Sequence, residues 1–164
     1  SHDQSIHLGT LRAPWPYTEQ DAKETLDSYA SRPPAEQDMR LAIRLGAPDA
    51  PVVGTICWDR PEELPRDRTT PLNECPHVVW EVGYWLATPY RGQGILPHVL
   101  QHVVKKVAWD QRDVVARVEV AGYVDNIASR RVAEKAGFVF EGIKRGAVVK
   151  GGEVRDLAVY SWIP

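Results

Sequence analysis

The 164-residue sequence is poor in cysteine, with only Cys57 and Cys75 present. These two residues form no Cys-x-x-Cys pair and no spacing with histidine that zinc sites use. The sequence therefore indicates neither a disulfide framework nor a structural zinc site. Unpaired thiols are typical of a reducing compartment, so we expect a cytoplasmic protein.

Long apolar runs and an excess of positive charge are also lacking. No run approaches the ~18–20 residues of a membrane-spanning helix, and residues 1–4 do not begin a secretory leader. Twenty lysines and arginines against 22 aspartates and glutamates give a net charge of −2. A chain with this charge has no overall positive electrostatic potential to hold the ~6–10 phosphate groups that a typical nucleic-acid binder contacts. We expect neither a membrane nor a nucleic acid as partner.

The composition is that of a globular domain, with 43% hydrophobic and 26% charged residues. A chain near this length buries roughly 68–70% of its unfolded surface, enough for an ordinary core without disulfides or metal. The sequence shows no internal repeat and no linker. We therefore expect one domain over residues 1–164.

The first half of the sequence predicts one helix and one hairpin. Residues 18–29 have a helical pattern that begins with a threonine and an aspartate in capping-box spacing. Two β-branched runs, 39–45 and 52–58, flank a Gly/Pro-rich turn and predict an antiparallel hairpin. The charged and proline-rich residues 59–76 predict a long surface loop.

The middle of the chain predicts a strand, a glycine loop, a helix and a second strand. Residues 78–86 are apolar on both faces except at Glu81, which is typical of a central strand. A helical pattern at 95–109 and a β-branched run at 114–120 follow. Such a unit predicts two parallel strands with a right-handed crossover.

The last part of the chain predicts a short helix and a hairpin. The helix covers residues 127–136 and ends at Gly137, a good left-handed cap. Strands at 138–150 and 153–162 meet at a Gly-Gly pair, which is a strong hairpin signal.

The loop at residues 91–96 has the sequence RGQGIL and joins the central strand to the helix. Backbone N–H groups at such a turn, together with the helix dipole, form a phosphate site. The alternative is a tight connection with no ligand. Two familiar phosphate loops are excluded, because GxxxxGK[ST] is absent and Pro97 stands where GxGxxG needs its third glycine.

The same loop matches [Q/R]xxGx[G/A], the pyrophosphate-binding motif of the GNAT acyltransferase superfamily. Its neighbours match in order and spacing: GYWL at 83–86, NIAS at 126–129 and EKAGF at 134–138. Over roughly residues 8–162 the chain closely resembles the RimJ/RimL-type branch, whose best-known members acetylate protein N-termini. The resemblance implies an α+β GNAT fold, a mixed twisted sheet of about six strands with helices on both faces.

Two features depart from the family pattern. Leu96 replaces the last Gly or Ala of the motif but still offers a backbone N–H, whereas Pro97 offers none. Residues 8–18 resemble what usually follows the first strand and first helix of the family, and neither element is found upstream. We therefore expect this chain to lack that strand and helix.

The resemblance implies an acetyl-CoA-dependent N-acetyltransferase that needs no metal. Its acceptor is a primary amine, either a protein N-terminal α-amine or a small molecule such as an antibiotic or a polyamine. A non-catalytic CoA-binding domain is the alternative from another class, and a homodimer is left open. Acceptor pockets in this superfamily are built from the first helices and variable loops, here residues 15–38 and 59–77.

Cofactor binding follows from the same resemblance. The strand before the glycine loop splays from the next parallel strand, and the pantetheine arm of acetyl-CoA enters the gap. Asn126 matches a position that holds this arm, although it is equally placed to cap the following helix. The residues implied in acetyl-CoA binding are Leu86, Ala87, Thr88, Arg91, Gly92, Gln93, Gly94, Ile95, Leu96, Asn126 and Ser129.

Glu81 and Ser129 are the predicted catalytic residues. As the sole charge in an apolar strand, Glu81 is expected to be buried, with a raised pKa that suits a proton acceptor. Its alternatives are a structural carboxylate paired with arginine or one pointing to solvent at a strand end. Many family members place a tyrosine acid where this chain has Ala133. Ser129, one helical turn earlier, is then the hydroxyl for the departing thiolate, or else an ordinary surface serine.

Three further patterns favour plain structural roles. His98 and His102 share a helix face, but without an HExxH arrangement or a third ligand they are expected to face solvent. Lys105 and Lys106 predict a solvated face. The core or a pocket wall is the expected place of five tryptophans: Trp15, Trp58, Trp80, Trp109 and Trp162.

Overall fold

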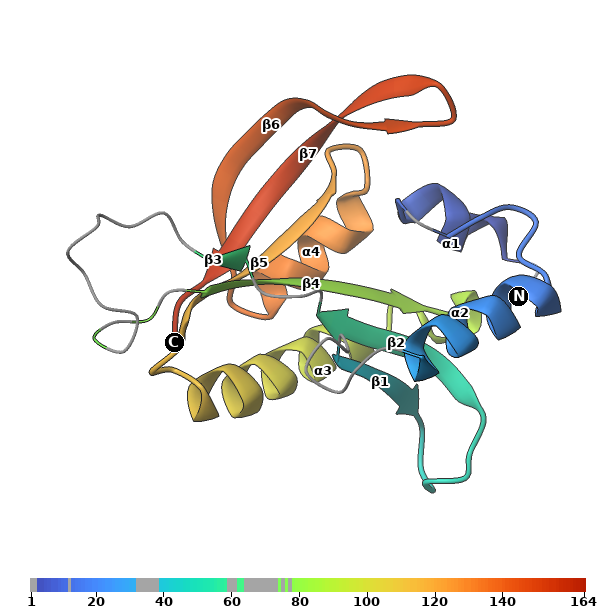
Figure 1. Ribbon diagram of the computed structural model, residues 1–164, viewed down its shortest axis with the longest axis horizontal. Coiled ribbons are helices and arrows are strands. Elements are labelled where there is room, and N and C mark those ends of the chain that lie inside the picture. The colour runs from blue at the N-terminus through green and yellow to red at the C-terminus, as the bar shows by residue number, and fades with distance from the viewer. Residues whose placement is uncertain are drawn as a thin grey trace.

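The structure is a computed structural model that describes residues 3–11, 13–31, 39–58, 62–63, 74, 76 and 78–164. Two helices come first, four strands follow, and α3, β5 and α4 precede the C-terminal pair of strands (Figure 1). In chain order the elements are α1 (Gln4–Gly9), α2 (Glu19–Ala30), β1 (Met39–Arg44), β2 (Val52–Trp58), β3 (Glu62–Glu63), β4 (Val78–Leu86), the 3₁₀ turn η2 (Thr88–Tyr90), α3 (Ile95–Val103), the π-helical turn η3 (Val104–Ala108), β5 (Val115–Tyr123), α4 (Ile127–Lys135), β6 (Val139–Lys150) and β7 (Glu153–Trp162).

The strands form one mixed sheet in the order β1-β2-β4-β5-β7-β6, with the short β3 paired to β4. Strands β1 and β2 are antiparallel, β4 and β5 are parallel, and β6 and β7 are antiparallel, as the sequence predicts. Helix α2 begins one residue later than expected, and its capping box is present: the Thr18 N–H donates to Asp21 at 2.7 Å. Helix α1 was not expected.

Helices cover both faces of the sheet. On one face α3, η3 and α4 pack against β4, β5 and β7, and the fully buried side chains there include Leu100, Val118 and Tyr160. Burial of each such aliphatic side chain contributes about 1.5–3 kcal/mol to stability. Helices α1 and α2 lie over the other face (Figure 1). This second face carries the site described below.

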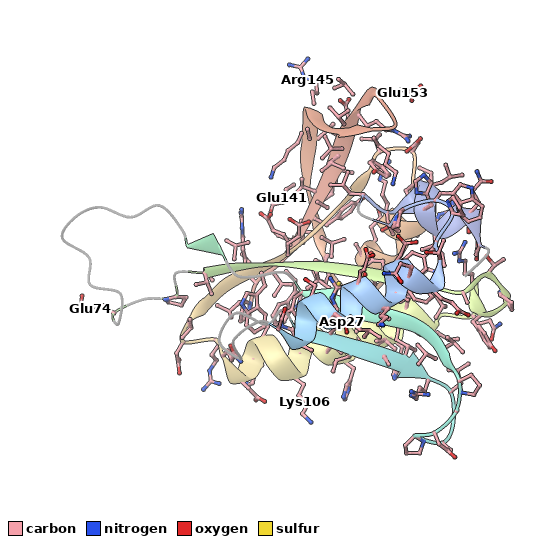
Figure 2. The ribbon with its side chains drawn as sticks, turned by 45° about the vertical axis from the view of Figure 1, so that its right-hand side comes forward. Asp27, Glu74, Lys106, Glu141, Arg145 and Glu153 are labelled. Carbon is pink, nitrogen blue, oxygen red and sulfur yellow. The ribbon has the colours of Figure 1, made fainter. Side chains whose placement is uncertain are left out.

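The exposed side of the α3–η3 helix agrees with its sequence, with one exception. His98 and His102 are exposed, and Lys106 points away from the sheet (Figure 2). Trp109 is 54% exposed, with the Arg112 guanidinium 5.1 Å from its ring, so its expected place in the core or a pocket wall is wrong. It is the C-cap of η3, directly after the buried Ala108.

The two parallel strands separate halfway along their length. Residues 78–81 of β4 pair with residues 115–119 of β5, and this pairing stops at Glu81 and Glu119. Beyond that point β4 pairs with β2 and β5 pairs with β7. The predicted splay of these two strands is therefore confirmed, and it leaves a gap between residues 82–86 and residues 120–123.

The tip of the β6–β7 hairpin is tied to the N-terminal segment. The Lys150 ammonium donates to three backbone carbonyls, those of Thr10 at 3.0 Å, Leu11 at 3.2 Å and Ala13 at 3.3 Å. His7 Nδ1 donates to the same Ala13 carbonyl at 2.6 Å. These bonds hold the segment after α1 over the open face of the sheet.

Replacing Lys150 by Met should release this segment while keeping the aliphatic stem. We expect the variant to lose about 1.5–3 kcal/mol of unfolding free energy, the usual contribution of hydrogen bonds to a charged group. Amide hydrogen exchange should accelerate in residues 10–16, because their anchor is gone.

Lys144→Met is the matched control, since Lys144 is exposed on the same strand. It should leave the exchange rates of residues 10–16 unchanged. Equal protection in the Lys150 and Lys144 variants would contradict the anchoring role.

Candidate active site

A cavity of about 780 Å³ lies between the N-terminal helices and the open face of the sheet. His7, Trp15 and Asp21 line it from the helical side, and Glu81 and Tyr123 line it from the sheet. It continues into the gap between β4 and β5, where Tyr84 and Ser129 belong to its wall. Of the two segments expected to build the acceptor pocket, residues between 15 and 28 line this cavity, and most of 59–77 lies outside the described residues.

The cavity face of β4 follows from strand alternation. Trp80 and Val82 point into the core and are 7% and 3% exposed. Glu81, between them, points the other way and is exposed on the cavity wall. The expected burial of Glu81 is wrong, because only one face of this strand is packed.

Ser129 lies inside the gap between the two strands. Its Oγ donates to the Tyr84 hydroxyl at 3.3 Å, and that hydroxyl donates to the Ser129 carbonyl at 3.0 Å. A Cβ on Gly122 of β5 would come within 3.5 Å of the same Oγ. Ser129 is thus bracketed by β4 on one side and β5 on the other, which no surface serine would be.

Tyr84 is the residue of this cluster that the sequence did not single out. Burial raises the pKa of the Tyr84 hydroxyl to about 12, so the phenol stays neutral at ordinary pH. The matched GYWL segment marks its position. Its contact with a residue 45 positions away in the chain is set by the packing of α4 on the sheet.

Asn126 caps α4, which confirms one of its two predicted roles. Its Oδ1 accepts from the Ser129 N–H at 3.1 Å. Its Nδ2 donates to the Gly9 carbonyl at the end of α1, at 3.3 Å. The same amide therefore fixes the start of α4 and contacts the N-terminal segment at the edge of the gap.

The glycine loop ends at the N-terminus of α3 in the form that a phosphate requires. Gly92 and Gly94 have φ of 76° and 77°, a left-handed conformation that glycine adopts without strain. The N–H groups of Gly94, Ile95 and Leu96 have no hydrogen-bond acceptor within the described parts of the chain. Three free donors at a helix start fit an anionic group.

Arg91 is engaged by the chain itself. Its Nε donates to the Leu86 carbonyl at 2.7 Å and its Nη1 to Ser5 Oγ at 2.7 Å, with Asp3 Oδ2 3.5 Å from Nη2. The Thr88 N–H donates to the same Asp3 carboxylate at 3.3 Å. Hydrogen bonds from Ser5 and Thr88, with the charge of Arg91, lower the pKa of Asp3 to about 2.

The other predicted cofactor residues near this point also have partners. The Ala87 N–H donates to the Val53 carbonyl at 2.8 Å. The Gln93 side chain donates to the Pro89 carbonyl at 3.0 Å and so braces the loop. The structure therefore brings the loop, Asn126 and Ser129 to one end of the gap, with Glu81 on the same cavity.

Two general properties complete the description. No group of three or more His, Cys, Asp or Glu side chains in the described residues is arranged to hold a metal ion. No helix within those residues is long and apolar enough to cross a membrane.

Comparison with curated proteins gives relatives of one kind. A ribosomal-protein-serine acetyltransferase of Escherichia coli (strain K12) is 31% identical over 112 residues, which cover 68% of this chain and 55% of that protein. YdaF of Bacillus subtilis (strain 168) is 33% identical over 81 residues, 49% of this chain and 43% of that protein. The chain spans about half the length of these relatives.

Solved structures share the fold. The microcin C7 self-immunity acetyltransferase MccE, in complex with acetyl-CoA and AMP, has a TM-score of 0.76 at 19% identity, and the alignment covers 98% of this chain and 81% of that chain. RimL, a ribosomal L7/L12 α-N-protein acetyltransferase in complex with CoA, has a TM-score of 0.71 at 22% identity, and the alignment covers 96% of this chain and 80% of that chain. The predicted α+β architecture is thereby confirmed.

The acetyltransferase (GNAT) domain model matches residues 3–139, so the chain belongs to the GNAT acetyltransferase family, and its relatives are consistent with the RimJ/RimL-type branch.

Proposed function

We propose that the protein is an acetyl-CoA-dependent N-acetyltransferase acting on a primary amine, in the cytoplasm, with a protein N-terminal α-amine as acceptor. The observation that carries this proposal is the gap between β4 and β5, which opens into the cavity and has the glycine loop and Ser129 beside it. Relatives named for ribosomal-protein acetylation support the choice of acceptor.

The glycine loop would hold the pyrophosphate of acetyl-CoA. Its three free N–H groups supply donors that side-chain substitutions do not remove. The gap would take the pantetheine arm, next to Asn126 and Ser129. When bound, acetyl-CoA supplies the activated acetyl group, and the chain supplies position and proton transfer.

Glu81 would accept the proton of the acceptor amine. The reaction forms an N–C bond and breaks the C–S bond, so the nitrogen loses a proton and the sulfur gains an electron pair. An exposed carboxylate on the cavity wall takes that proton directly or through one water. Its exposure also lets the proton pass on to bulk solvent.

Ser129 would stabilise the departing thiolate. Its hydroxyl lies in the gap and already donates a hydrogen bond, to Tyr84. A neutral hydroxyl acts on developing charge by hydrogen bonding, because its own proton is too weakly acidic to transfer fully. Tyr84 is also neutral, so it holds Ser129 in place without adding a charge of its own beside the thiolate.

The proposed function is tested by thiol release from acetyl-CoA with a panel of amines. Peptides with a free N-terminus should stimulate release, whereas the same peptides with a blocked N-terminus should not. A polyamine and an aminoglycoside test the small-amine alternative. Binding of acetyl-CoA in calorimetry without stimulation by any amine would instead support a non-catalytic CoA-binding domain.

Gly94→Val should weaken acetyl-CoA binding far more than Gln93→Ala. Gly94 has φ of 77°, so valine would strain the loop and crowd the approach of the pyrophosphate. We expect the Kd for acetyl-CoA to rise at least about tenfold, which corresponds to 1.4 kcal/mol. Calorimetry measures it directly.

Gly46→Val is the strain-matched control, because Gly46 has φ of 87° and, like Gly94, no atom within 4 Å of an added Cβ. It lies in the β1–β2 turn, away from the loop. An equal loss of affinity in this variant would assign the effect to general destabilisation rather than to the loop.

Glu81→Gln should lower kcat by about 10²–10⁴-fold, the usual range for a lost general base. The Kd for acetyl-CoA should stay unchanged, since the two side chains have the same shape. Glu119→Gln, at the neighbouring register position in β5, is the control and should stay close to wild type. Full activity of Glu81→Gln at neutral pH would eliminate the role.

Ser129→Ala should lower kcat by about tenfold with little change in the KM for acetyl-CoA, the pattern of an interaction made chiefly in the transition state. The helix start should survive, because Asn126 bonds the backbone N–H of residue 129 and not its hydroxyl. Steady-state kinetics separates the outcomes. An unchanged kcat would show that Ser129 has only a structural role. A raised KM for acetyl-CoA with an unchanged kcat would show that Ser129 binds the cofactor and does not take part in catalysis.

A further inference from the structure

Tyr123 has a hydroxyl that the described part of the chain leaves without a hydrogen-bond partner. The residue is only 3% exposed and belongs to the cavity wall. Buried tyrosines normally find a partner for this group. An unsatisfied buried hydroxyl costs about 1–3 kcal/mol, so its presence at a cavity needs a reason.

The position of Tyr123 follows from the geometry of β5. Gly122 faces α4, because a Cβ there would meet Ser129 Oγ. Side chains alternate along a strand, so Tyr123 turns to the opposite face, beneath the N-terminal segment. It is the last residue of β5 and pairs with Leu157 of β7, another residue of the cavity wall.

The ring of Tyr123 is held in place from one side. The Arg155 guanidinium lies over it, 4.7 Å from the ring centre, and pairs with the Asp125 carboxylate. Burial raises the pKa of Tyr123, the charge of Arg155 opposes this and that of Asp125 adds to it. The phenol is therefore a neutral hydrogen-bond donor on a fixed ring.

We propose that the Tyr123 hydroxyl donates a hydrogen bond to an amide carbonyl of a bound substrate and so positions that substrate at the mouth of the gap. This inference rests on the proposed function. An amide carbonyl reaches the site from two sources, the pantetheine arm of acetyl-CoA or the backbone of a peptide acceptor. A neutral donor suits a neutral carbonyl, and either source would satisfy the orphaned hydroxyl.

Tyr123→Phe tests the assignment, with Tyr160→Phe as the matched control. Tyr160 is equally buried, but its hydroxyl accepts from Arg130 at 3.0 Å and donates to Glu134 at 2.9 Å. The Tm of the free Tyr123→Phe protein should equal or exceed that of wild type, because no bond is lost. The Tm of Tyr160→Phe should fall, and its ligand affinities should stay unchanged.

Binding distinguishes the two sources of the carbonyl. The loss of one hydrogen bond should weaken binding about 3–10-fold. A rise of the Kd for CoA in calorimetry identifies the pantetheine arm. An unchanged Kd for CoA with a raised KM for a peptide, but not for a simple alkylamine, identifies the acceptor.

Two results with the variant would overturn the assignment. Wild-type affinity for CoA together with a wild-type KM for the peptide in Tyr123→Phe would show that the hydroxyl contacts neither. A lowered Tm of that free variant would show that the hydroxyl already has a partner. If wild-type protein bound neither ligand, the proposed function would fall first and this assignment with it, whereas failure in the variant alone leaves the proposed function intact.

Discussion

The site depends on one interrupted strand pairing. Strands β4 and β5 share hydrogen bonds only as far as Glu81 and Glu119, yet both continue beyond that point. Unpaired backbone inside a protein is costly, so such a split survives only where other partners hold the strands. Here β2 supports β4 and β7 supports β5 from their outer edges. The inner edges remain available, and the cavity enters between them.

The N-terminal segment closes this opening from the cavity side with bonds to distant parts of the chain. Asp3 bonds Thr88, the Gly9 carbonyl accepts from Asn126, and Lys150 holds three carbonyls after α1. A six-residue helix has little stability of its own. It exists because these contacts hold it, and they place it against residues on both sides of the gap at its open end.

The sequence predicts the features that depend on local patterns and misses those that depend on contacts between distant parts of the chain. Strand β4 has the expected bounds, and the Gly-Gly hairpin and the parallel pair follow from local patterns. Helix α1 is too short for periodicity to detect. For Glu81 the pattern showed an apolar strand but not which face lacks a covering layer. The Tyr84–Ser129 contact and the unpartnered Tyr123 hydroxyl arise from packing between elements far apart in sequence.

The hydroxyl groups around the gap differ in whether an existing hydrogen bond must break before they can bond a ligand. Ser129 and Tyr84 bond each other, so a new bond from Ser129 replaces an existing one and the net gain is small. Tyr123 gives up nothing within the described chain, and a bond from it also removes the cost of an unsatisfied buried group. A hydrogen bond from Tyr123 therefore stabilises the bound substrate and the transition state equally. A hydrogen bond from Ser129 becomes stronger only when negative charge grows on its acceptor in the transition state. Under the proposed function, Tyr123 would therefore position the substrate, whereas Ser129 would respond to the transition state.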